Sequence, residues 1–197
     1  SGKDLYFGCG DPVINLDLGG GKSYKILDLG CGSGYDLVRL AEKLNLPSFI
    51  VGVDMTREMI VNAQKRVKEG GLQNVDFILA DITYLPLITS SVDAATSNCV
   101  INLTKSKSRV FRELHRVLKE SGTLVVSDIV SDQRLPSEYK KNPTLWSRCL
   151  SGAITLKSYL KAITSSGFSA KILERKLWKR LDGYKFYTVT LTAKKRD

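Results

Sequence analysis

The chain has 197 residues, enough for one domain with a full core, and its 43% hydrophobic and 25% charged residues are typical of a soluble globular protein. No apolar run is long enough to cross a membrane, and no secretory hydrophobic region is visible at the start of the sequence, so we expect neither a membrane-spanning nor an exported protein. The formal net charge of +10 favours anionic partners, but Lys and Arg are mostly scattered, so we interpret them as a solvated surface and expect no nucleic-acid partner.

The first half of the chain alternates between strand-like and helix-like patterns. Residues 1–23 are rich in Gly and Asp and are predicted to form an arm or loop. An apolar strand over 24–30 then runs into a cluster of glycines, and a helix is expected over 35–44. A second apolar strand follows over 49–55. This order predicts the beginning of a parallel sheet with crossover helices.

The alternation continues with a helix whose two ends carry recognisable signals. Thr56 is placed as its N-cap, and Gly70 and Gly71 are expected to end it. A third strand is predicted over 75–81 and a fourth over 92–98.

An amphipathic helix is expected over 108–122, followed by a fifth strand over 123–130. The segment 131–152 lacks periodicity and is predicted to be a lid-like loop with short helical turns. A last helix is expected over 156–167.

Two strand-like runs close the chain, over 169–178 and 184–193. We expect them to form a hairpin, which would place one antiparallel strand in an otherwise parallel sheet. The predicted architecture is a single α/β Rossmann-like domain over 24–197, with helices on both faces of the sheet.

The most specific motif is ILDLGCGSG, in which a buried strand ends in Gly30, Gly32 and Gly34 before a helix. Glycines at this place permit a tight turn and a close approach of the backbone to a ligand. Asp54 ends the second strand and is suited to accept hydrogen bonds from ribose hydroxyls, and Asp81 ends the third and is suited to accept one from an adenine amino group. Two acids at these strand ends make a nucleoside-containing cofactor the preferred ligand.

An NAD-binding turn is the nearest rival to this interpretation. Its G-x-G-x-x-G pattern requires a glycine where Tyr35 stands, which argues against NAD. Cys31 lies inside the turn, where its backbone is expected to serve the cofactor and its sulfur is given no role.

Four cysteines, Cys9, Cys31, Cys99 and Cys149, lie far apart without a C-x-x-C pair. This spacing excludes a zinc knuckle and a small secreted disulfide scaffold, and it predicts a cytoplasmic protein with reduced thiols. A free cysteine is usually a buried hydrophobe. Cys9, Cys99 and Cys149, however, each border the crevice at the carboxyl ends of the predicted strands, and three thiols there favour a soft, thiophilic centre.

The sole histidine, His115, lies within the predicted helix over 108–122 and is interpreted as structural. Chemistry that needs no histidine base is therefore preferred.

The glycine turn and the strand-end acids resemble those of the class I S-adenosylmethionine (SAM) methyltransferases, over about residues 24 to 195. The resemblance implies SAM as cofactor and the strand order 3-2-1-4-5-7-6, with strand 7 antiparallel. It also implies that Asp28 lies near the methionine end of SAM, and that Met55 and Ile82, beside the strand-end acids, belong to the cofactor site.

Five segments, YFGCG, GVDMT, SNCVINL, RVLKESGTLVVSD and LWSRCLSGA, resemble those of arsenite methyltransferases in the same order. This resemblance implies that Cys99 and Cys149 bind As(III), with Cys9 as third thiol, and that a cellular thiol reductant is a partner. It further implies that Tyr6 and Gly8 close over the cofactor and that Asn98 lies near its methionine end. Members commonly carry another cysteine before the arm and a C-terminal extension, both outside the printed sequence.

Three alternatives remain open at this point. The first is a SAM-dependent methyltransferase for another small acceptor, with thiols that are merely structural. The second is an RNA methyltransferase, which the positive charge suggests, although SNCV differs from the Asn-Pro-Pro-Tyr type of motif used on nucleic-acid bases. The third is a SAM-binding or arsenic-sequestering module without turnover.

Overall fold

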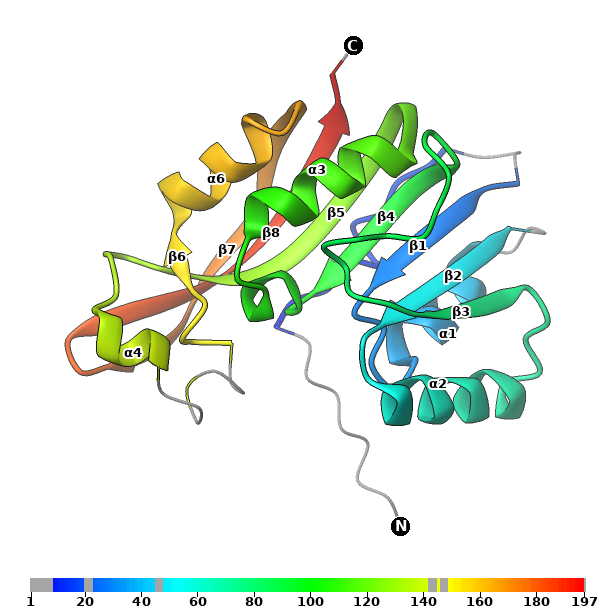
Figure 1. Ribbon diagram of the computed structural model, residues 1–197, viewed down its shortest axis with the longest axis horizontal. Coiled ribbons are helices and arrows are strands. Elements are labelled where there is room, and N and C mark those ends of the chain that lie inside the picture. The colour runs from blue at the N-terminus through cyan, green and yellow to red at the C-terminus, as the bar shows by residue number, and fades with distance from the viewer. Residues whose placement is uncertain (1–8, 20–22, 45–47, 142–144, 146–148, 197) are drawn as a thin grey trace.

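The computed structural model describes residues 9–19, 23–44, 48–141, 145 and 149–196. Its strands form one sheet in the order β3-β2-β1-β4-β5-β8-β7, with a short β6 beside β5 (Figure 1). The strands are β1 (Lys25–Leu29), β2 (Phe49–Asp54), β3 (Val75–Leu79), β4 (Val92–Asn98), β5 (Leu118–Ser131), β6 (Ile154–Thr155), β7 (Phe168–Leu181) and β8 (Tyr184–Lys195). The helices are α1 (Tyr35–Leu44), α2 (Arg57–Glu69), α3 (Lys107–Val117), α4 (Ser137–Lys141) and α6 (Leu156–Thr164), with a 3-10 turn η1 (Ile101–Leu103). Among the described residues, no helix combines the length and the apolar character needed to span a membrane.

The predicted sheet order is confirmed for the long strands. β1 to β5 run parallel to one another, and β8 pairs antiparallel with both β5 and β7. The predicted sixth and seventh strands are β7 and β8, since the two-residue β6 was not predicted.

Helices cover both faces of the sheet because successive strand residues point to opposite sides. Ile26 of β1 packs in one buried cluster with Leu37 and Leu40 of α1. The adjacent Leu27 packs on the other side, in a cluster with Phe111 of α3 and with residues of α6. The continuous apolar strands of the sequence are therefore explained by burial on both faces.

The helix predicted over 108–122 is shorter than expected. α3 ends at Val117, and Leu118 already pairs with β4, where the ladder shifts its register. The chain then bends at Ser121, whose φ is 58°, and at Gly122, where a Cβ would lie 2.8 Å from the carbonyl oxygen of Lys119. The apolar spacing of the helix continues into β5, so periodicity alone placed the boundary too late.

The two end signals of α2 are confirmed in position. Thr56 is the N-cap residue, but its side chain makes no capping hydrogen bond; its backbone N–H instead donates to Asp54 Oδ1 at 2.9 Å. Gly70 occupies the C-cap and donates to the carbonyl of Arg66, and Gly71 follows with a φ of 67°. The strand-end acid therefore also organises the entry to the helix.

The described part of the predicted lid contains α4, and its apolar residues pack inward. Leu135 and Leu150 are buried in a cluster with Cys149 and Phe186. That this segment acts as a lid stays a prediction.

The N-terminal segment, residues 9–19, is packed onto the domain. Val13 and Leu16 are buried in the cluster that α1 and α2 also enter. The ammonium group of Lys43 on α1 donates to three carbonyl oxygens of this segment, at distances from 2.6 to 2.9 Å, and so fixes its path. These oxygens belong to Val13, Ile14 and Leu16.

We expect Lys43→Met to lower the free energy of unfolding by about 1 kcal/mol, because it leaves those carbonyls without their charged donor. Lys65→Met is the matched control. Lys65 is exposed, and its Nζ lies 3.9 Å from Glu69 Oε1, an exposed ion pair that contributes little to stability. Urea denaturation measures both. Equal effects of the two substitutions would show that Lys43 does not hold the segment.

Candidate functional site

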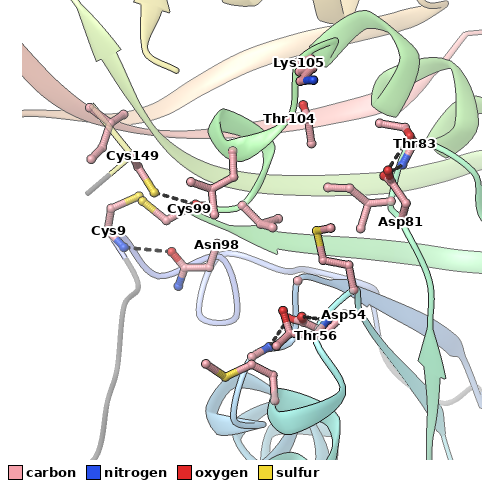
Figure 2. Close-up of a pocket in the computed structure, with 18 of the residues that line it drawn as sticks. Cys9, Asp54, Thr56, Asp81, Thr83, Asn98, Cys99, Thr104, Lys105 and Cys149 are labelled. Atoms are coloured by element: carbon pink, nitrogen blue, oxygen red, sulfur yellow. Dashed lines mark hydrogen bonds between the residues drawn. The ribbon is translucent and has the colours of Figure 1, made fainter. Parts of the chain in front are cut away.

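A cavity of about 1240 Å³ lies at the carboxyl ends of the parallel strands. Figure 2 shows Asp54 and Asp81 along one part of its wall and the labelled cysteines along another. Ligands of open α/β sheets bind at this edge. The edge holds most of the predicted site residues.

The three glycines of the turn have different physical reasons to lack a side chain. Gly30 has a φ of 63° and a Cβ there would lie 2.4 Å from Val100, whereas a Cβ on Gly34 would lie 3.0 Å from Ala63 of α2. Gly32, with a φ of 52°, has no atom closer than 4.0 Å to such a Cβ and faces the cavity. The turn therefore leaves open space beside its backbone, which suits a bound cofactor.

Both strand-end acids line the cavity and are held by backbone amides. Asp54 Oδ2 accepts from the N–H of Gly32 at 3.0 Å, which ties the second strand to the glycine turn. Asp81 Oδ1 accepts from both the N–H and the hydroxyl of Thr83 at 2.8 Å. The predicted neighbours Met55 and Ile82 also line the wall.

Asp28 lies beneath the turn and is buried, with its Oδ1 accepting a 2.7 Å hydrogen bond from the hydroxyl of Thr96. Burial raises the pKa of Asp28 to about 8, the charge of Asp36 adds to the rise, and the Thr96 bond opposes it. The Cys31 side chain is buried in the cluster beside α1 and α2. That its sulfur has no role in the site stays a prediction. Tyr6 and Gly8 lie outside the described residues.

The three predicted thiols come together at one end of the cavity. The Sγ atoms of Cys9 and Cys99 and a carboxylate oxygen of Asp128 lie within 4.8 Å of one another. The Cys149 thiol donates to the carbonyl oxygen of Cys99 at 3.0 Å (Figure 2). Segments that are far apart in the sequence thus place their sulfurs side by side.

Hydrogen bonding between the thiols and burial both act on their acidity. The bond to Cys99 and the burial of Cys149 raise the pKa of the Cys149 thiol. For Cys99, the bond from Cys149 lowers the pKa. The bond to Cys9 and burial together outweigh that effect, so the pKa of Cys99 is raised. For Cys9, burial and neighbouring negative charge outweigh the lowering bond from Cys99, so its pKa is also raised. All three thiols are therefore protonated at neutral pH.

The side-chain amide of Asn98 ties the N-terminal segment to the end of β4. Its Oδ1 accepts from the N–H of Cys9 at 3.0 Å, and its Nδ2 donates to the carbonyl of Gly10 at 3.0 Å and to Asp36 at 2.9 Å. A Cβ at Gly10 would lie 2.6 Å from the hydroxyl oxygen of Ser127, so only glycine fits this path. The sequence alone did not indicate Gly10 or Asp36.

Two of the thiols lie on unusual backbone. Cys99 has a φ of 62° and Cys149 a φ of 60°, in the left-handed region that favours glycine. A residue with a Cβ costs about 1–2 kcal/mol there. Such strain is concentrated at functional sites, where the surrounding structure holds it in place.

Asp128 lies beside the Cys9 and Cys99 thiols and was not predicted. It is fully buried on β5, with its Oδ2 accepting from the Tyr159 hydroxyl at 3.0 Å. Burial raises the pKa of Asp128 to about 6, against the opposing charge of Lys107. An acid inside the apolar run TLVVSDIV was the available signal, because an unpartnered charge is costly in a buried strand.

The fold and the cavity define a class I SAM-dependent methyltransferase domain, whose cofactor is SAM. Residues 20–186 match the family described as "Methyltransferase domain", and the chain belongs to it. The crystal structure of CrArsM, an arsenic (III) S-adenosylmethionine methyltransferase from Chlamydomonas reinhardtii, is similar with a TM-score of 0.80 and 34% identity, over 95% of this chain and 67% of that one. Within the class, the chain is a member of the arsenite methyltransferase family.

Curated relatives agree with this placement. The arsenite methyltransferase of Halobacterium salinarum is 36% identical over 169 residues, covering 86% of this chain and 43% of the relative. That of Homo sapiens is 37% identical over 172 residues, covering 83% of this chain and 45% of the relative. The chain therefore spans about half the length of the curated relatives it matches.

An alanine variant is usually more stable than a glycine variant at the same position. We expect the strained backbone at Cys149 to reverse this order of stability. Cys149→Gly is predicted to be more stable than Cys149→Ala by about 1 kcal/mol, because glycine adopts a positive φ without strain. At Cys31, whose φ is not positive, Cys31→Ala is predicted to be the more stable, by about 0.4–1 kcal/mol. Chemical denaturation of the four variants measures both orders. The same order at both sites would contradict strain at Cys149.

Proposed function

We propose that this protein transfers a methyl group from SAM to trivalent arsenic held by Cys9, Cys99 and Cys149. The observation that carries the proposal is the cavity itself, which has a glycine turn and two acids along one part of its wall and three adjacent thiols along another. The similarity to arsenite methyltransferases supports the same acceptor.

The cofactor residues fit a nucleoside with a charged tail. Gly30 and Gly32 would lie against it, and Asp54 and Asp81 would accept hydrogen bonds from its ribose and adenine. When bound, SAM supplies an electrophilic methyl group on a cationic sulfur.

The thiols are suited to exchange with arsenic that arrives bound to small thiols. Each protein thiol gives its proton to a departing thiolate, so three As–S bonds break, three form, and three small thiols leave. Because the protein thiols are protonated at neutral pH, this exchange needs no external base. A cellular thiol reductant would supply the small-thiol complexes.

The chain contributes mainly by positioning. Three sulfurs on arsenic form a pyramid, which leaves the arsenic lone pair pointing away from them and available as the nucleophile. The amide of Asn98 holds Cys9 beside Cys99, and the fixed backbone of Cys99 and Cys149 directs the other two sulfurs. Holding donor and acceptor in attack geometry is worth about 7–11 kcal/mol in favourable cases.

Two other functions give different results in the same experiments. A methyltransferase for another small acceptor would be insensitive to loss of a thiol. A sequestering module would bind As(III) and protect its thiols without forming methylated arsenic.

We expect Cys99→Ser and Cys149→Ser each to lower arsenic methylation by about 100-fold or more, because a misplaced acceptor loses attack geometry. The assay uses SAM, As(III) and excess thiol, with methylated arsenic separated by chromatography. SAM binding by calorimetry is the control and should be retained in both variants. Wild-type protein that binds SAM and As(III) but forms no methylated arsenic would refute turnover.

Alkylation should report the protonated state of the thiols. The rate at Cys9, Cys99 and Cys149 is predicted to rise about tenfold per pH unit between pH 7 and 9, since only the thiolate reacts and each pKa is raised. As(III) should protect all three together while leaving Cys31 unchanged, as measured by mass spectrometry of the labelled peptides. A rate that is independent of pH in this range would contradict the raised pKa values.

A further inference from the structure

The carboxylate of Asp128 is not needed to hold arsenic by three sulfurs, yet it lies within 4.8 Å of the Cys9 and Cys99 sulfurs. We propose that Cys9, Cys99 and Asp128 form a binding site for a thiophilic divalent cation of the zinc group, such as Zn²⁺ or Cd²⁺. This goes beyond the proposed function, because the second ligand uses a different set of donor atoms at the same place.

The donor set matches the preference of such cations. Zn²⁺ takes thiolates at about 2.3 Å and carboxylate oxygens at about 2.0–2.2 Å, and it commonly keeps three protein ligands with a fourth position open. Ligand atoms of one tetrahedral site are then about 3.5–3.8 Å apart. Small side-chain rotations would bring the three atoms from their present separations to these distances.

The charges around Asp128 also fit a divalent cation. Lys107, the first residue of α3, is largely buried and its charge lowers the pKa of Asp128. Two thiolates, one carboxylate, one divalent cation and the Lys107 ammonium group together carry no net charge. A buried site without net charge avoids the desolvation cost of an uncompensated ion.

The orientation of Asp128 is set before any ligand binds. The Tyr159 hydroxyl donates to its Oδ2 at 3.0 Å, and the N–H of Ile129 donates to its Oδ1 at 3.0 Å. A ligating carboxylate with such outer partners is typical of metal sites in proteins.

Cation binding and arsenic binding would compete for Cys9 and Cys99 but depend on different third residues. Arsenic requires Cys149, whereas the cation requires Asp128. On binding, the cation replaces the protons of the two thiols, which go to solvent, so its affinity rises with pH. The competition would make zinc-group cations inhibitors of arsenic binding.

The test is a Cd²⁺ titration of the full chain, reduced with a phosphine rather than a thiol and followed by sulfur-to-cadmium ultraviolet absorbance. Asp128→Asn is predicted to weaken Cd²⁺ binding by about 10–100-fold and to leave As(III) protection of the thiols nearly unchanged. Cys149→Ser should do the reverse. Loss of Cd²⁺ binding in Cys149→Ser, or unchanged Cd²⁺ affinity in Asp128→Asn, would overturn the proposal.

A second measurement does not depend on how well the variants fold. Cadmium NMR of the wild-type protein separates a two-sulfur, one-oxygen site from a three-sulfur site by chemical shift, and we expect the former.

Tyr159→Phe is the matched control for Asp128→Asn, because it removes the hydrogen bond to the carboxylate while keeping the ligand. Tyr159→Phe should weaken Cd²⁺ binding less than Asp128→Asn does. An equal loss of Cd²⁺ affinity in both variants would contradict ligation by Asp128. Failure of arsenic methylation would leave these cadmium results unaffected, so the two proposals are tested separately.

Discussion

The side-chain amide of Asn98 joins the N-terminal segment to the end of β4 through two hydrogen bonds in opposite directions, one to Cys9 and one to Gly10. Its third bond, to Asp36, links this junction to the first helix. At this junction the segment passes so close to Ser127 that Gly10 has no room for a Cβ. An amide is required here, since a carboxylate would lose the two bonds that Asn98 donates and an aliphatic group would lose all three.

The thiol end of the cavity carries costs that the rest of the fold must offset. Cys99 and Cys149 have positive φ values, and Asp128 is a fully buried carboxyl group on β5. Each of these is unfavourable by itself. They occur together where three sulfurs meet, whereas β1 pairs with β2 and with β4 in regular parallel register. The concentration of unfavourable features at one place is what distinguishes the site from the core around it.

The sheet was predictable because its strands are short apolar runs separated by amphipathic helices, a pattern that burial on both faces imposes. The strand-end acids and the glycine turn were predictable for the same reason, since the carboxyl ends of parallel strands share one edge. The end of α3 was not, because Leu118 satisfies both the helical spacing and the strand that follows. The roles of Gly10 and Asp128 were not predictable, because they depend on contacts with residues distant in sequence. The left-handed backbone of Cys149 was not predictable either, because no feature of the local sequence indicates it.

The sulfur atoms come from three separate stretches of chain: Cys149 lies 50 positions after Cys99, and Asn98, the neighbour of Cys99, lies 89 positions after Cys9. A trivalent ligand bonded to all of them would act as a removable cross-link that closes two large loops. Like a disulfide, such a link would restrict the unfolded chain, and its effect grows with loop length. The proposed substrate would then stabilise the folded chain for as long as it is bound. Release of the product would remove the cross-link.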